Sequence, residues 1–143
     1  MRTNRIGRRK FLHWTLTLAG FGASGLLRPL TASGGDAVRT ALFQKLHATF
    51  DGRRRSVEGV GRAYLNSLAS VPSANAMADD LLAAIPALSK ACLHAGTEQV
   101  QNVLWQRFRR DFAEERTVEL QGYVLSVTEC RLCGLIALLT IGN

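Results

Sequence analysis

The stretch SVTECRLCGLIALL, residues 126–139, decides the fold of this chain. It opens with Ser-x-x-Glu, a capping box in which the side chains of Ser126 and Glu129 each accept a hydrogen bond from the other residue's backbone amide. The helix that it predicts, from Val127 to about Leu139, is apolar on almost every side. Such a helix is buried in its own core or against a partner, and ~13 residues are too few to cross a bilayer. The candidate interface residues on it are Leu132, Leu135, Ile136 and Leu139.

Upstream of this stretch, apolar residues recur at helical spacing and turn signals separate the segments. Gly59 and Gly61 weaken the second segment unless they allow another element to pack closely. The spacing predicts helices over residues 36–50, 56–70 and 87–95. Between the last two it predicts a helix that Ser73 or Asn75 caps and that ends near Pro86. After residue 95 it predicts a helix that Thr97 caps and whose core side runs to Phe112.

In RTVELQGYVLS, residues 116–126, apolar residues recur at every second position instead of every third or fourth. Val118 and Leu120 precede a Gln-Gly turn, and Tyr123 and Leu125 follow it. This alternation predicts a short β-hairpin. The expected fold is therefore all-α, a small helical bundle of about five helices, with one short hairpin before the last helix. We expect two parts, a leader over residues 1–33 and a single helical domain over residues 34–143.

The net charge of +7 is unevenly distributed along the chain. Residues 1–28 hold six of the 18 basic residues and none of the 11 acidic ones, which leaves the remainder near neutrality. A basic chain ordinarily suggests a nucleic-acid partner. Because the excess lies in the leader, we expect no nucleic-acid binding.

The leader has the organisation of an export signal: a basic start, an apolar run over residues 11–27, and the small residues TASGG at 31–35. The sequence RRKFL within it resembles the twin-arginine (Tat) signal, in which Arg-Arg is followed by any residue and then Phe-Leu. The matching positions are Arg8, Arg9, Phe11 and Leu12. This resemblance implies export of the folded protein through the Tat translocon into a bacterial periplasm. If the leader is not cleaved, it would instead attach the protein to the inner membrane.

The motif CRLC places Cys130 and Cys133 in the predicted last helix, a full turn beyond its cap. A reactive thiol pair usually lies at a helix N-terminus, where the helix dipole stabilises thiolate. Buried structural thiols are therefore the first interpretation, and a disulfide or redox pair is the second. A metal site that also uses Cys92 and His94 is the third interpretation, but cysteines within a regular helix do not form the usual chelating loop.

Charged residues elsewhere in the chain are predicted to lie on solvated surfaces. Arg53, Arg54 and Arg55 form a basic run that could meet a phosphate or an acidic partner. Asp111 and Glu115 share one face of a helix but have no facing acidic element, so we expect both at the surface. No hydrolase, phosphate-loop, dinucleotide or zinc-protease motif is present in the sequence. We therefore expect no catalytic residue, bound cofactor or resident metal.

Leader, size and helical body together resemble the small, gamma-type subunits of membrane-bound, FAD-dependent sugar or alcohol dehydrogenase complexes. The resemblance implies a non-catalytic periplasmic accessory subunit that escorts and stabilises a larger exported oxidoreductase subunit. No site residue is carried over, because no diagnostic motif matches. Two alternatives remain from the sequence: an independent periplasmic thiol protein using Cys130 and Cys133, and a membrane-anchored interaction protein.

Overall fold

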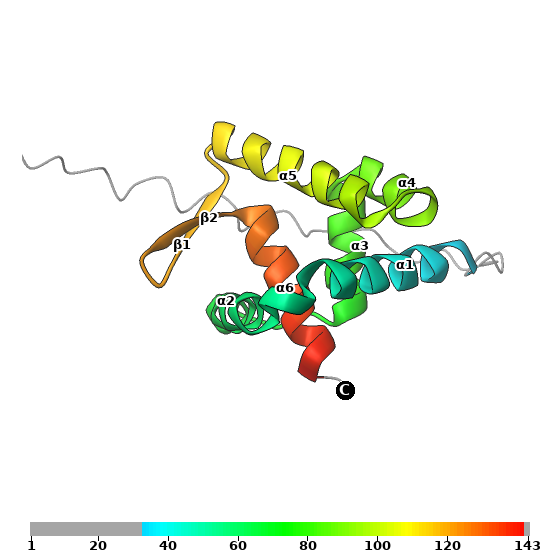
Figure 1. Cartoon of the computed structure of the whole chain (residues 1–143). Coiled ribbons are helices and arrows are strands. Elements are labelled where there is room, and N and C mark those ends of the chain that lie inside the picture. Colours follow the sequence, from blue (N-terminus) through cyan, green and yellow to red (C-terminus); the bar gives the residue numbers. More distant parts are fainter. Residues whose placement is uncertain (1–32, 142–143) are drawn as a thin grey trace, which may run out of the picture. The chain divides into compact units, whose positions relative to one another are not determined.

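The computed structural model describes residues 33–141, and these residues form helices with one two-stranded hairpin (Figure 1). This arrangement confirms the predicted fold class. The expected export signal, with Arg8, Arg9, Phe11 and Leu12, lies outside the described residues. The elements are α1 (Ser33–Phe50), the 3₁₀ turn η1 (Asp51–Arg53), α2 (Arg54–Ser67), α3 (Ala74–Ala84), α4 (Pro86–His94), α5 (Thr97–Ala113), β1 (Thr117–Leu120), β2 (Tyr123–Ser126) and α6 (Val127–Ile141).

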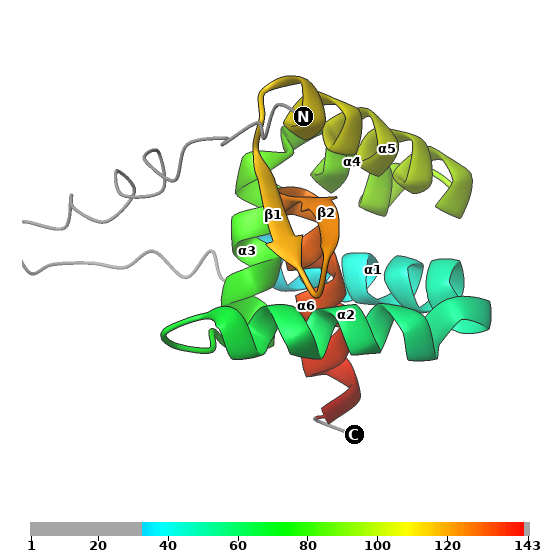
Figure 2. The same ribbon diagram turned by 90° about the vertical axis from the view of Figure 1, so that its left-hand side faces the viewer.

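The last helix, α6, runs through the middle of the bundle, and the other elements surround it (Figures 1 and 2). It packs most extensively against α2, and it also contacts α3, α5 and the hairpin. Leu132, Leu135 and Ile136 are buried in this core. Three of the four candidate interface residues thus belong to the chain's own core, and Leu139 is only partly buried. This burial explains why the helix has almost no polar side.

The crossing of α2 and α6 depends on Gly61. A Cβ atom at Gly61 would lie 2.1 Å from the carbonyl oxygen of Cys133 and 2.9 Å from Cβ of Ala137. At Gly59, on the same helix, a Cβ atom would meet nothing within 4 Å. Of the two glycines that weaken the predicted helix, only Gly61 is therefore required for close packing.

Two helix starts follow the local chemistry of the sequence, whereas α1 begins three residues before the predicted 36 and α2 two residues before the predicted 56. Ser73 caps α3 by accepting a hydrogen bond from the amide of Ala76 at 3.1 Å, and Pro86 is the first residue of α4. At the start of α5 the cap residue is Gly96, with no side-chain hydrogen bond, and Thr97 already lies inside the helix. The prediction that Thr97 caps this helix is therefore wrong by one residue.

The capping box at the start of α6 is confirmed. The amide of Glu129 donates to Oγ of Ser126 at 3.0 Å, and the amide of Ser126 donates to Oε2 of Glu129 at 2.8 Å. Ser126 is fully buried and Glu129 is half-buried, so both bonds are partly shielded from water. The box thereby fixes the point at which the hairpin turns into the central helix.

The hairpin is antiparallel, with Thr117 opposite Ser126 and Leu120 opposite Tyr123. Gln121 and Gly122 have φ values of 52° and 84°, the two positive values that a type I′ turn requires. The alternating pattern places Tyr123 and Leu125 on the same side of the hairpin. Leu125 packs against the core, but Tyr123 is 72% exposed.

Candidate functional site

The cysteines do not form a reactive pair in the described fold. All three are free thiols, and Cys92 and Cys130 are buried. Burial raises the pKa of Cys130 to about 11 and that of Cys133 to about 12, and it also raises the pKa of Cys92. A thiol must ionise before it can act as a nucleophile or a metal ligand. The environment therefore favours the interpretation of structural thiols over that of a redox pair.

The candidate metal ligands do not come together. His94 is exposed at the end of α4, whereas Cys92 faces the core. Within residues 33–141, no group of three or more histidine, cysteine or acidic side chains could hold a metal ion.

Asp111, which the sequence pattern assigned to the surface, is 1% exposed and lies on the core side of α5. Its Oδ2 accepts a hydrogen bond from the amide of Thr128 at 3.0 Å. Its Oδ1 accepts one from Nη2 of Arg116, and Nε of Arg107 lies 3.1 Å away without hydrogen-bond geometry. The surface prediction is therefore wrong, because this carboxylate is buried and has partners on α5, in the loop before β1 and on α6.

We refer to Asp111, Arg107, Arg116 and the amide of Thr128 as the Asp111 cluster. A carboxylate beside the first turn of α6 interacts favourably with the helix dipole and satisfies an amide that has no partner within the helix. Backbone bonds extend the connection, since the amide of Arg116 donates to the carbonyl of Asp111 at 2.8 Å and the amide of Val127 donates to the carbonyl of Arg116 at 3.0 Å. The cluster thus joins α5, the hairpin and α6, which is a structural role.

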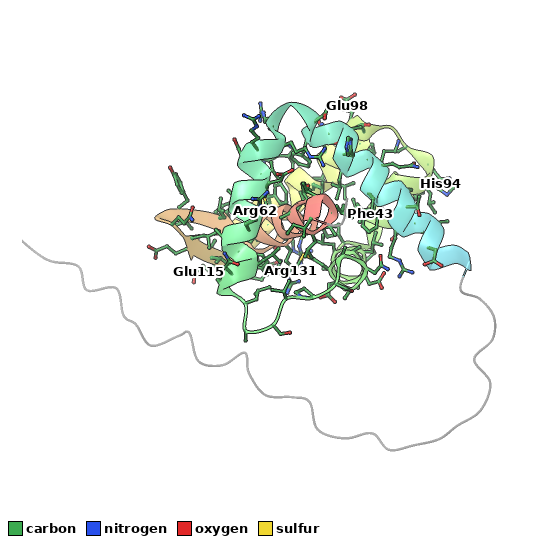
Figure 3. All side chains as sticks on the ribbon, turned by 90° about the horizontal axis from the view of Figure 1, so that it is seen from below. Phe43, Arg62, His94, Glu98, Glu115 and Arg131 are labelled. Carbon is green, nitrogen blue, oxygen red and sulfur yellow. The ribbon has the colours of Figure 1, made fainter. Side chains whose placement is uncertain are left out.

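An apolar groove lies between the second half of α1 and the C-terminal end of α6. Its volume is about 480 Å³. Figure 3 views this face, with the end of α6 between α1 and α2 and Phe43 labelled on α1. Its apolar lining consists of Phe43, Leu46, Ala48, Phe50, Ile136 and Leu139.

One end of the groove is polar. His47, Asp51, Arg54 and Thr140 line it. Nε of Arg54 donates to Glu58 at 2.9 Å, while its two terminal nitrogens make only long contacts, 3.3 Å to Nε2 of His47 and 3.4 Å to Oγ1 of Thr140. A hydrogen bond from Thr140, together with Arg54, lowers the pKa of Glu58, so this carboxylate stays ionised and holds Arg54 in place.

Further exposed apolar side chains lie on α5 and on the hairpin, two elements that follow each other in the chain (Figure 1). Trp105 is 58% exposed and Phe112 is 45% exposed, so Phe112 does not lie on the core side as the periodicity predicts. Seven residues separate them, which places both on one face of a helix. On the hairpin, Tyr123 and Val124 are exposed as well.

No family model, curated protein or solved structure shows significant similarity to this chain. Among the helices of residues 33–141, none has both the length and the apolar character that crossing a membrane requires.

Proposed function

We propose that this chain is a non-catalytic accessory subunit that docks on a larger exported redox enzyme, of the flavin-dependent dehydrogenase type, and escorts and stabilises it in the periplasm. The observation that supports it is the exposure of large apolar side chains on the hairpin and on α5. Tyr123, Val124 and Trp105 are each more than half exposed. Large exposed aromatic side chains are enriched at protein interfaces.

The geometry of the hairpin supports docking on a partner. A two-stranded hairpin is only marginally stable in water unless one side packs on another element. Here Val118 and Leu125 pack on the core, while Tyr123 and Val124 extend into solvent near the turn. Both strands also have an unpaired edge within the described sheet. A partner that covered this arm would bury the exposed side chains and pair the free backbone groups.

The export part of the proposal rests on the twin-arginine pattern Arg8, Arg9, Phe11 and Leu12. The pathway that recognises such a signal transports folded proteins. A small chain without a cofactor motif would need this pathway if it is exported together with a folded partner. The alternative of a periplasmic thiol protein has less support, because the pKa values of Cys130 and Cys133 are raised.

The test is recovery of the tagged full-length chain from its native periplasm and membranes, with the N-terminus of the recovered chain determined by mass spectrometry. We expect a stoichiometric flavoprotein partner with the wild type and with the control Leu93→Ser, which removes an exposed apolar residue of α4. The double variant Tyr123→Ser/Val124→Thr should lose the partner while keeping its thermal stability. A monodisperse wild-type chain recovered alone would refute the proposal.

A further inference from the structure

The groove between α1 and α6 combines an apolar wall with a basic mouth. Its volume of about 480 Å³ falls within the ~300–1,000 Å³ of small-molecule sites. Both helices supply large apolar side chains to it, among them Phe43, Phe50 and Leu139, and none of these three is fully buried. A ligand that fills the groove would therefore remove apolar surface of this chain from water, at roughly 25 cal/mol per Å².

The mouth of the groove adjoins a polar hollow, since Asp51 and Arg54 line both. Arg53 and Arg55 line the hollow, and neither forms an ion pair with another described residue. Glu58 is paired with Arg54 and also with Arg62. The mouth and the hollow together carry three arginines, Arg53, Arg54 and Arg55, against the two carboxylates Asp51 and Glu58, so their combined charge is positive.

We infer that this groove binds a medium-chain fatty acid such as dodecanoate, with the acyl chain between α1 and α6 and the carboxylate at Arg54. The terminal nitrogens of Arg54 make only the long contacts to His47 and Thr140, so N–H groups remain to donate to a carboxylate. Glu58 fixes the guanidinium from the other side through Nε. The ligand that fits this groove has an apolar chain and a single anionic end. The apolar chain matches the apolar wall, and the anionic end complements the positive mouth. The inference is independent of the proposed docking function, which uses α5 and the hairpin.

The experiment is isothermal titration of the full-length chain with sodium dodecanoate, kept below its micellar concentration. We expect saturable binding of one dodecanoate per chain. Dodecanol should bind at least tenfold more weakly, because it lacks the charge, and dodecyltrimethylammonium more weakly still, because its charge is repelled. Equal binding of all three would overturn the assignment of the headgroup, and an absence of dodecanoate binding would overturn the site.

Two matched pairs of variants locate the site. Ala48→Phe places a ring in the groove and should abolish binding, whereas Ala83→Phe on α3 adds the same ring at an exposed position elsewhere. Arg54→Gln and Arg62→Gln each remove one arginine partner of Glu58, but only Arg54 lines the groove. We expect at least a tenfold loss for Arg54→Gln and no change for Arg62→Gln. Unchanged binding by Ala48→Phe, or equal losses within either pair, would refute the location.

Discussion

Replacing Gly61 with alanine should destabilise the protein, although alanine is the better helix former. The new Cβ atom would lie 2.1 Å from the carbonyl oxygen of Cys133, and ordinary contact begins at 3.4 Å. The two helices must therefore separate by about 1.3 Å, the difference between these distances. The obstacle is backbone, which cannot rotate away as the end of a side chain can. Overpacking of this kind costs about 1–3 kcal/mol, and the rigid neighbour favours the upper value.

The helix propensity of alanine offsets about 1 kcal/mol of this cost. The free energy of unfolding of Gly61→Ala should therefore fall by about 2 kcal/mol. Gly59→Ala is the matched control on the same helix, where the added Cβ atom meets nothing within 4 Å. This control should gain about 1 kcal/mol, so the two substitutions are expected to have opposite signs.

Urea unfolding followed by circular dichroism at 222 nm measures both variants. The midpoint should move down for Gly61→Ala and up for Gly59→Ala, with unchanged slopes, because each change alters stability rather than the surface exposed on unfolding. At roughly 4 °C per kcal/mol, thermal midpoints should fall by about 8 °C and rise by about 4 °C. If Gly61→Ala were as stable as Gly59→Ala, the close approach of α2 to α6 would not exist.

Three further predictions concern the Asp111 cluster, the cap of α6 and the thiols. Asp111→Asn should lower the free energy of unfolding by about 2 kcal/mol, because it weakens a charge-assisted hydrogen bond and removes the ion pairs with two arginines that keep contact with water; thermal unfolding measures this loss, and a change below 1 kcal/mol would contradict it. Ser126→Ala should cost about 1 kcal/mol in urea unfolding, and Glu129→Gln, which retains an acceptor oxygen, should cost less. The raised pKa values of Cys130 and Cys133 favour the folded state while both thiols are protonated. The contribution of these thiols to stability should therefore be constant below pH ~9 and be lost as the pH rises towards 11–12, a loss that Cys133→Ala should reduce in urea titrations at each pH.

Local signals in the sequence were sufficient for most element boundaries. The Ser126 box, Ser73 and Pro86 each act through atoms within four residues, so the pattern alone identifies them. The hairpin follows from the Gln121-Gly122 pair for the same reason. Thr97 was misassigned because a glycine precedes it, and glycine can also occupy the cap position without a side-chain bond.

The pattern failed where distant parts of the chain meet. Asp111 lies seven residues after the buried Leu104 and three after Phe108, so it occupies the apolar stripe of α5. A lone acidic residue in such a stripe was the available signal for a buried carboxylate. Arg116 is near it in the sequence, but Thr128 reaches it only because the hairpin reverses the chain, which periodicity along one helix does not reveal. The same applies to Gly61, whose partner on α6 is more than 70 residues away.

The position of α6 has a consequence for how the protein is made. The central helix is the last element of the described fold to leave the ribosome, yet α2, α3 and α5 all pack against it. While the earlier helices emerge, α1, α3, α4 and α5 can contact one another, but the surfaces of α2, α3 and α5 that pack on α6 stay uncovered until α6 has been synthesised. The twin-arginine pattern, by contrast, emerges first. A chain that stopped before α6 would therefore carry this pattern but would lack the helix on which α2, α3 and α5 pack.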